Sequence, residues 1–153
     1  MAADVSRLRR LSAGSGFTLC EAILRSFAGL SLREGAPWRT LLAVSANSEA
    51  VVEAALLAAK EADCPIFFAA TLNQVDPDGG YTGWTHKRFA AVVRQTARRI
   101  SFKGAVLLGV DHAGPWLRDR HTTEKWPYRR TLAAITRSLE AAIEAGFDRK
   151  RRY

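Results

Sequence analysis

An aspartate and a histidine stand side by side in the segment LLGVDHAGP, Leu107 to Pro115. Its apolar start predicts a buried strand, and Asp111 and His112 follow directly after that strand. A carboxylate can move a proton, and a neutral imidazole can bind a metal ion such as Zn²⁺. The pair therefore indicates either the edge of a functional site or a polar loop in which Asp111 caps a backbone turn.

Three apolar runs that alternate with segments of helical periodicity would position this pair. We predict strands over 40–46, 65–71 and 104–110, and helices over 48–62, 85–100 and 131–145. Asn47 or Ser48 and then Thr85 are placed to cap the first two helices, and Gly146 is placed to end the third. This alternation predicts an α/β fold with parallel strands, in a doubly wound sheet or a barrel. The chain has no glycine-rich nucleotide-binding motif after any strand, which argues against a nucleotide site.

The loops that follow parallel strands gather at one face of the sheet, where ligands bind. We expect Asn73, Asp111 and His112 to lie together at that end. The segment DPDGG, residues 76–80, is explained by turn chemistry alone. The polar residues directly after the first two strands are candidates for binding a sugar or a phosphate: Ser45, Asn47, Asn73 and Gln74.

Each helix carries an apolar face that predicts how it packs. The faces are Val51, Ala54, Ala55, Ala58 and Ala62 in the first helix, Phe89, Val92, Val93 and Ile100 in the second, and Leu132, Ile135, Leu139 and Ile143 in the third. His86 and His121 fall in polar surroundings, so we expect both on the surface. A further helix is predicted from Phe17, with Gly29 as its stop.

Composition limits the classes of protein to which this chain can belong. Of the 153 residues, 48% are hydrophobic and 25% are charged, which is the mixture of a globular domain, and no apolar run approaches the roughly 20 residues of a membrane span. Cys20 and Cys64 match no ligand spacing, which favours a reduced, cytoplasmic protein with buried thiols. The net charge of +8 leaves nucleic acid as a distant alternative partner, because solvated helix faces and a basic tail also explain that charge.

Three longer motifs give a more specific signal. The segments SANSEAVVEAAL, ATLNQVDPDGGYTGWT and GVDHAGPW, in this order and spacing, resemble the non-catalytic subunit family of class II D-tagatose-1,6-bisphosphate aldolase, once labelled as a tagatose-6-phosphate kinase. The resemblance covers residues 41–147. It implies a TIM-type barrel and an accessory role in carbohydrate catabolism, in which the chain supports a catalytic aldolase subunit and meets a sugar phosphate.

In the related catalytic aldolases, an Asp-His pair ends a barrel strand. By that resemblance Asp111 would be the general acid/base and His112 a ligand to Zn²⁺, the cofactor implied for the full-length family. A zinc site needs about three protein ligands, and His112 is the single candidate here. We therefore expect no stable zinc and no catalysis by this chain alone; the alternative is a zinc-dependent sugar aldolase or epimerase on the same barrel.

The resemblance also predicts the domain organisation. Family members continue after the segment that matches EAGFD, whereas here RKRRY follows it. Because three strand–helix units cannot close a barrel of about 250 residues, we expect an N-terminal fragment that is poorly stable as a monomer. The expected parts are a helical segment and loop over 1–38, an incomplete (β/α) barrel over 39–147 and a basic tail over 148–153.

Overall fold

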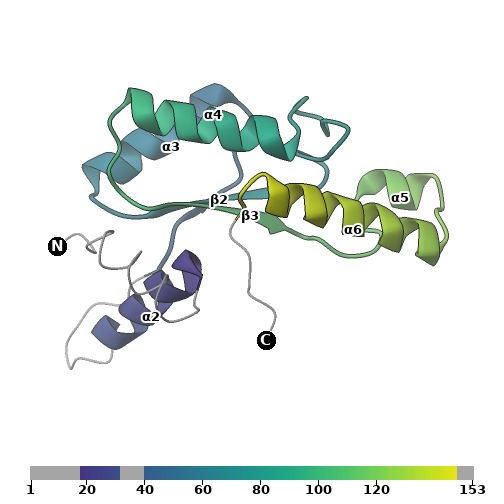
Figure 1. The fold of residues 1–153 in the computed structure, drawn as a ribbon, viewed down its shortest axis with the longest axis horizontal. Helices are drawn as coiled ribbons and strands as arrows, with labels where there is room; N and C mark the ends of the chain where they lie inside the picture. The colour runs from purple at the N-terminus through teal and green to yellow at the C-terminus, as the bar shows by residue number, and fades with distance from the viewer. Residues whose placement is uncertain (1–17, 32–39, 148–153) are drawn as a thin grey trace.

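The computed structural model describes residues 18–31 and 40–147. Its elements, in chain order, are α2 (Leu19–Ser31), β1 (Ala43–Val44), α3 (Glu49–Glu61), β2 (Ile66–Thr71), α4 (His86–Arg99), β3 (Val106–Asp111), α5 (Asp119–Thr123) and α6 (Tyr128–Glu144). Helices α3 and α4 lie on one face of a central sheet, and α2 lies on the other (Figure 1). This order is that of an α/β fold, as the sequence predicts.

The sheet has three parallel strands in the order β1-β2-β3. Strands β2 and β3 pair along their whole length, from Ile66 opposite Val106 to Thr71 opposite Asp111. Pairing with β1 is limited to two residues, Ala43 and Val44, which is shorter than the predicted strand over 40–46. Among the described residues, β1 has one neighbouring strand, β2. The predicted parallel neighbours are confirmed, and within the described residues the sheet is open.

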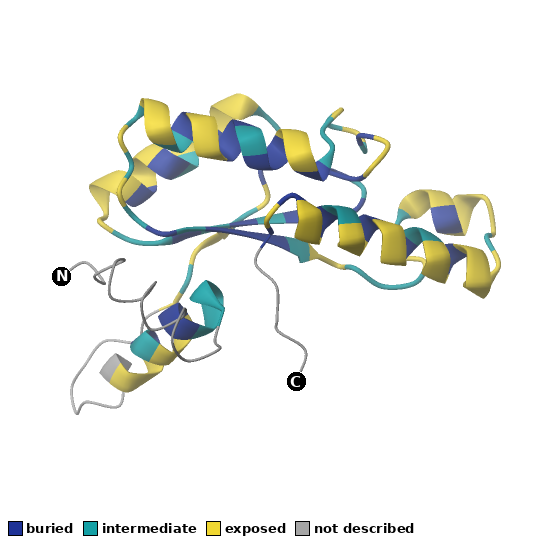
Figure 2. Cartoon of the chain, viewed as in Figure 1, coloured by how far each residue is buried: buried dark blue, intermediate teal, exposed yellow. Residues whose placement is uncertain are grey.

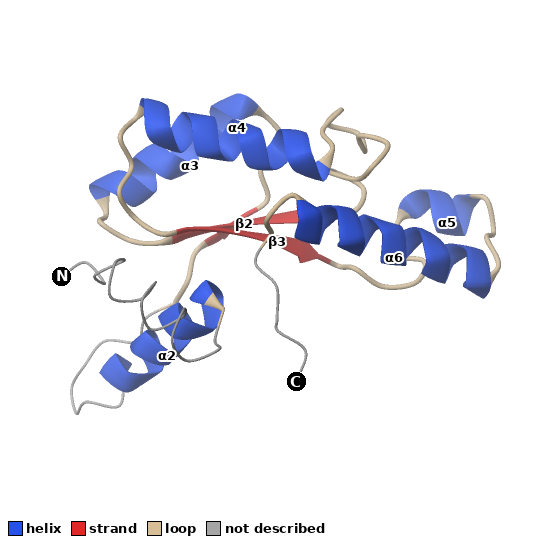
Figure 3. Ribbon diagram, viewed as in Figure 1, coloured by secondary structure: helices blue, strands red, loops and turns tan. Residues whose placement is uncertain are grey.

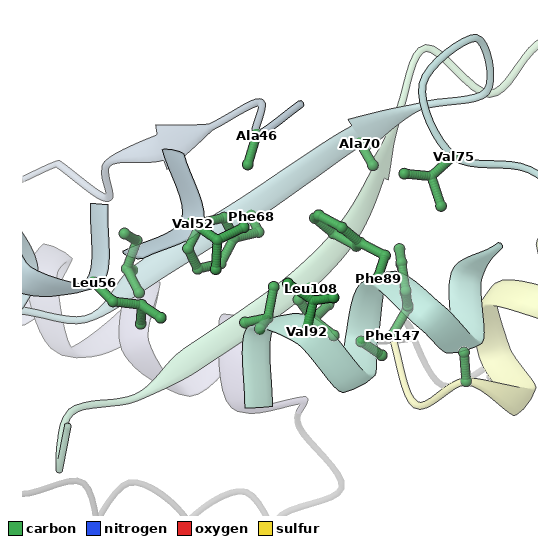
Figure 4. Close-up of a cluster of buried hydrophobic side chains, with 14 of the residues drawn as sticks. Ala46, Val52, Leu56, Phe68, Ala70, Val75, Phe89, Val92, Leu108 and Phe147 are labelled. Carbon is green, nitrogen blue, oxygen red and sulfur yellow. The ribbon is translucent and has the colours of Figure 1, made fainter. Parts of the chain in front are cut away.

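The larger core lies between the sheet and helices α3, α4 and α6 (Figure 4). Alternate residues of the strands point into it, including Phe68 and Leu108. Helix α4 contributes Phe89, Val92 and Val93, all buried as predicted. Burying side chains of this size stabilises the fold by about 1.5–3 kcal/mol each.

A smaller core lies on the opposite face of the sheet and is covered by α2. Ala22, Ile23 and Phe27 of this helix pack with Ala105 and Leu107. The start of α2 is fixed by a reciprocal pair of bonds in which the N–H of Glu21 donates to Thr18 and the N–H of Thr18 donates to Glu21. The helix continues through Gly29 to Ser31, so the predicted stop at Gly29 is wrong.

The helix ends follow the capping chemistry of the sequence. Ser48 accepts a bond from the N–H of Val51, and Thr85 accepts one from the N–H of Arg88. Gly146, at φ +81°, ends α6. The N–H of Gly146 donates to Ile143, and that of Phe147 donates to Ala142. Helix α5 was not predicted, because its five residues lie in a segment that looks only polar in the sequence.

Two predicted helix faces are wrong. Helix α3 buries Val52, Leu56 and Ala59 rather than the face that contains Val51. Figure 2 shows exposed positions along the outer sides of the helices, and three of the four predicted core residues of α6 are among them. Those three are Leu132, Leu139 and Ile143, each more than a third exposed, whereas Ile135 is buried.

The remaining predictions on organisation are tested only in part. The N-terminal segment over 1–38 is described between residues 18 and 31, where it is helical, and the basic tail over 148–153 lies outside the described residues. Cys64 packs against the larger core and Cys20 against the smaller one, both half-buried. None of the described helices is both long and apolar enough to cross a membrane.

Candidate functional site

The predicted site residues meet at the C-terminal edge of the sheet, where β2 and β3 end beside the loops drawn in tan in Figure 3. Asp111 pairs with Thr71 in the last register position of the two strands. Asn73 follows two residues after Thr71, and His112 comes directly after Asp111. The predicted shared location of Asn73, Asp111 and His112 is therefore confirmed.

The Asp111–His112 pair projects into solvent. His112 Nε2 lies 3.6 Å from Asp111 Oδ2, with 69% of the His112 side chain and 50% of the Asp111 side chain exposed. His112 has a φ of +54°, in the left-handed region that non-glycine residues seldom adopt. Such backbone strain is found at turns and at functional sites alike, so it agrees with either interpretation of the pair.

The ligand set for zinc is incomplete at this edge. Three or more protein ligands are the rule for Zn²⁺, and no three His, Cys, Asp or Glu side chains group suitably for a metal within residues 18–31 and 40–147. His112 has Asp111 as its only ionisable neighbour within an ion-pair distance there. The residues described at this edge do not fit a zinc ion, and no chemical step is derived through one.

Gln74 holds the ends of two strands together. Its Oε1 accepts a bond of 2.6 Å from Ser45 Oγ and a bond of 3.0 Å from the N–H of Thr71. The residue is 5% exposed. Ser45 and Gln74, both candidates for substrate binding, are therefore bonded to each other, and Asn47 is exposed without a side-chain hydrogen bond to any described residue.

Asn73 connects the same loop to α5. Its Nδ2 donates to Asp119 Oδ1 at 3.0 Å, and its Oδ1 accepts from the N–H of Asp119 at 3.0 Å. Both polar atoms of the amide are thus used to position the first turn of α5. In this arrangement Asn73 positions α5 at the edge of the site. A sugar could hydrogen-bond to the Asn73 amide only by displacing Asp119.

An arginine between two aspartates stabilises the loop further. Arg118 Nη1 donates to Asp76 Oδ2 at 2.6 Å, and its Nη2 donates to Asp78 at 2.7 Å. Asp76 also accepts a bond of 2.5 Å from Ser138 Oγ on α6. We call these four residues the Asp76 network. This network could not be predicted from the sequence, because Asp76 and Asp78 lie in an ordinary turn motif and Arg118 is 40 or more residues away.

Burial sets the electrostatics of the Asp76 network. Burial raises the pKa of the Asp76 carboxyl above its ordinary value, while the bond from Ser138 and the charge of Arg118 oppose part of that rise. A carboxylate removed from water and bonded on both oxygens cannot readily act on a substrate. Asp76 therefore serves to hold the loop after β2 against α6.

His86 and His121 are buried, which corrects their predicted surface positions. They are 2% and 1% exposed, and their ring nitrogens have no hydrogen-bond partner among the described residues. His121 stacks on Trp126 at 4.7 Å, and His86 meets Phe147 edge-on at 5.4 Å. Burial lowers the pKa of both imidazoles, with a further lowering of the His121 pKa by the charge of Arg118. Both pack as aromatic rings among apolar neighbours.

Two comparisons with known proteins bear on this site. The model of a family described as "D-tagatose-1,6-bisphosphate aldolase subunit GatZ/KbaZ-like" matches residues 31–150. The chain belongs to this family. The GatZ/KbaZ-like match includes all three strands and the whole C-terminal edge, so the resemblance to this family is confirmed.

A solved structure of a similar protein supports the same assignment. It is titled "Crystal structure of a probable tagatose 6 phosphate kinase from Sinorhizobium meliloti 1021", and it matches with a TM-score of 0.60 and 35% sequence identity. The match covers 71% of this chain and 27% of that chain. This chain therefore spans about a quarter of the length of that relative.

Proposed function

We propose that this chain is an accessory, non-catalytic component of class II D-tagatose-1,6-bisphosphate aldolase in carbohydrate catabolism, and that it acts in the cytoplasm. The observation that supports this most directly is how the candidate residues are bonded. Gln74 and Asn73 are held by Ser45 and Asp119, and the buried carboxylate of Asp76 is held by Arg118 and Ser138. Because these side chains are held by hydrogen bonds, they form a rigid surface, as expected of a subunit that supports a catalytic partner.

The three strand–helix units are proposed to form the first part of a (β/α) barrel. Parallel strands β1, β2 and β3 with helices α3, α4 and α6 follow the repeat of that fold. In a barrel, the C-terminal edge that carries Asp111 and His112 is the face at which substrates bind. A sugar phosphate or a catalytic subunit would meet the chain at this face.

The test is to titrate the purified chain into a catalytic class II tagatose-bisphosphate aldolase subunit. The quantities to measure are the rate of tagatose-1,6-bisphosphate cleavage and the half-life of the catalytic subunit at raised temperature. We expect both to increase and then reach a plateau. The proposal is wrong if a saturating amount of the chain leaves both unchanged.

A variant separates support from catalysis. Asp111→Asn combined with His112→Ala removes the acid/base candidate and the metal-binding candidate at the C-terminal edge while changing exposed side chains. We expect this variant to support the catalytic subunit as well as the unaltered chain does. Loss of the effect would instead favour a direct chemical role for the pair.

A further inference from the structure

The loop that leads from β3 to α5 presents large apolar side chains to solvent. Trp116 and Leu117 of this loop are 45% and 48% exposed, and Tyr128, the first residue of α6, is 53% exposed. The ring centroids of Trp116 and Tyr128 lie 5.7 Å apart, at the place where α5 runs beside the start of α6 (Figure 1). Single exposed apolar side chains are ordinary, but adjacent ones mark interaction sites on soluble proteins.

Trp116 is held in place despite an unfavourable backbone conformation. Its φ is +60°, in the left-handed region that bulky residues seldom adopt. The indole Nε1 donates to the carbonyl oxygen of Trp126 at 3.0 Å, and the carbonyl oxygen of Trp116 accepts from Thr122 Oγ1 at 3.1 Å. Because these bonds fix the indole, little side-chain entropy is lost when a partner covers it. A strained residue that presents a fixed, exposed indole is the kind of position from which a binding role is inferred.

Cations that lack an anionic partner accompany these apolar side chains. Lys125, Arg129 and Arg130 form no ion pair with another residue in the described part of the chain. The guanidinium of Arg130 lies over the ring of Trp126, 3.7 Å from its centroid, and this cation–π contact holds it beside the apolar surface. Arginine next to tryptophan and tyrosine is the composition of the residues that contribute most to protein interfaces.

We propose that a set of neighbouring residues, here called the tryptophan patch, forms a docking surface for a protein partner: Trp116, Leu117, Tyr128, Arg129 and Arg130. The surface that complements it offers an apolar pocket rimmed by carboxylates. Under the proposed accessory function, on which this inference rests, that surface belongs to the catalytic aldolase subunit. Trp116 and Tyr128 fill the pocket, and the two arginines pair with the carboxylates around it.

Two other occupants fit the tryptophan patch less well. A second copy of this chain in a two-fold contact would bring Arg129 and Arg130 close to their own counterparts, and like charges repel. A single-stranded nucleic acid needs rings on which successive bases stack, whereas Trp116 and Tyr128 are inclined at 43° to each other. Glu124, the residue that ends α5, would also repel phosphate groups.

Binding to a catalytic class II tagatose-bisphosphate aldolase subunit tests the docking surface. The subunit is immobilised, and biolayer interferometry measures its binding of the whole 153-residue chain. We expect saturable binding that weakens as the salt concentration rises from about 0.05 M to about 0.5 M, because the arginines act through their charge. An unrelated acidic protein on the sensor is the control for non-specific attraction to a basic chain.

Two variants and two matched controls locate the docking surface. Leu117→Ser with Tyr128→Ser should weaken binding at least about tenfold, as expected when apolar residues at the centre of an interface are truncated. Arg129→Glu should weaken binding and make it less sensitive to salt. Leu57→Ser and Arg98→Glu make the same kinds of change at exposed positions of α3 and α4, and should leave the affinity unchanged.

Circular dichroism establishes that each variant is folded. Arg129→Glu decides the result if the double serine variant does not fold, since the Arg129 side chain has no hydrogen bond or ion pair within the described ranges.

The docking surface is wrong, and the accessory function stands, if the unaltered chain binds the subunit and the patch variants bind it equally well. No binding by the unaltered chain overturns both proposals. Patch variants that keep their affinity for the subunit but lose binding to a single-stranded oligonucleotide would assign the patch to nucleic acid and overturn the inference. The same holds for a dimer in light scattering that these variants dissociate while subunit binding is unchanged.

Discussion

Arg118 lies between two carboxylates, with 15% of its side chain exposed. At the scale of single residues, the polar groups at the C-terminal edge mostly bond to one another. Breaking a buried ion pair by removing one partner leaves an uncompensated charge, which costs more than the loss of an exposed pair. The Asp76 network therefore provides a sensitive test of whether this edge is held together as described.

Replacing Arg118 with Met should lower the free energy of unfolding by about 3–5 kcal/mol, because Asp76 is left buried without its cation. Urea unfolding followed by circular dichroism measures the change. Arg120→Met is the matched control, since Arg120 pairs with Glu124 at the surface and that pair contributes less than about 1 kcal/mol. Equal effects of the two substitutions would contradict the burial of the Asp76 network.

The buried imidazole of His86 predicts a pH dependence of stability. Its pKa is lower in the folded chain than in the unfolded chain, where it is about 6.5. The folded chain thus binds fewer protons at His86 than the unfolded chain does. Neutral His86 therefore contributes its full share of the folding stability above about pH 6.5, and this contribution is lost as the pH falls toward the folded pKa. His86→Phe should reduce the loss of stability between about pH 7.5 and about pH 5.5. An identical loss in both proteins, measured by urea unfolding, would contradict a buried neutral ring.

The location of the site residues could be predicted from the sequence, whereas their hydrogen bonds and some of their burial could not. The shared location of Asn73, Asp111 and His112 could be predicted because position along a parallel strand fixes the edge at which a residue lies. Their bonding could not, since Asn73 meets Asp119 across 46 residues of sequence. The burial of His86 was missed because its neighbours Thr85 and Lys87 are polar, and tertiary packing rather than local sequence covers it.

At the scale of elements, the loop from Leu72 to Thr85 positions most of the site, and its glycines permit that path. Gly80 has a φ of +53°, and a Cβ on it would lie 2.4 Å from the carbonyl oxygen of Gln74. Gly83 has a φ of +74°, but a Cβ there would meet nothing within 4 Å. The two positions share the left-handed backbone and differ in the space around them.

Gly83→Ala should therefore cost about 1–2 kcal/mol through backbone strain alone. Gly80→Ala should cost about 1–3 kcal/mol more, because the added methyl group clashes with the backbone of the same loop. Thermal or urea unfolding of both variants gives the difference. Gly80→Ala with the same stability as Gly83→Ala would show that the loop follows a different path.

The order of the three strands and of helices α3, α4 and α6 could be predicted from alternating apolar runs and caps, and it is confirmed, whereas α5 was missed. The helix faces were harder to predict. In α3 the segment AVVEAALLAAKEA has apolar residues on nearly every side, so periodicity does not distinguish Val51 from Val52. In α6, Leu132 and Leu139 were predicted to be core residues, but each side chain is more than a third exposed. Among the described residues, nothing covers the flank of the helix on which they lie.

At the scale of the whole molecule, the three parallel strand–helix units that the structure describes form a sheet that is open within residues 18–31 and 40–147. The incomplete ligand set and the bonded polar side chains predict that the chain does not retain zinc. After dialysis against zinc and then against zinc-free buffer, metal analysis should find well below one ion per chain, as for a protein with one or two available ligands. Stoichiometric zinc that is lost on His112→Ala would support the alternative of a zinc-dependent sugar enzyme.

We propose that this GatZ/KbaZ-like chain supports an aldolase and does not catalyse the reaction itself. The most direct measurement is cleavage of tagatose-1,6-bisphosphate by the purified chain with added zinc, alone and together with a catalytic subunit. We expect no turnover above background by the chain alone, and faster or longer-lasting turnover by the mixture than by the catalytic subunit. Zinc-dependent turnover by the chain alone that disappears in Asp111→Asn or His112→Ala would contradict the account.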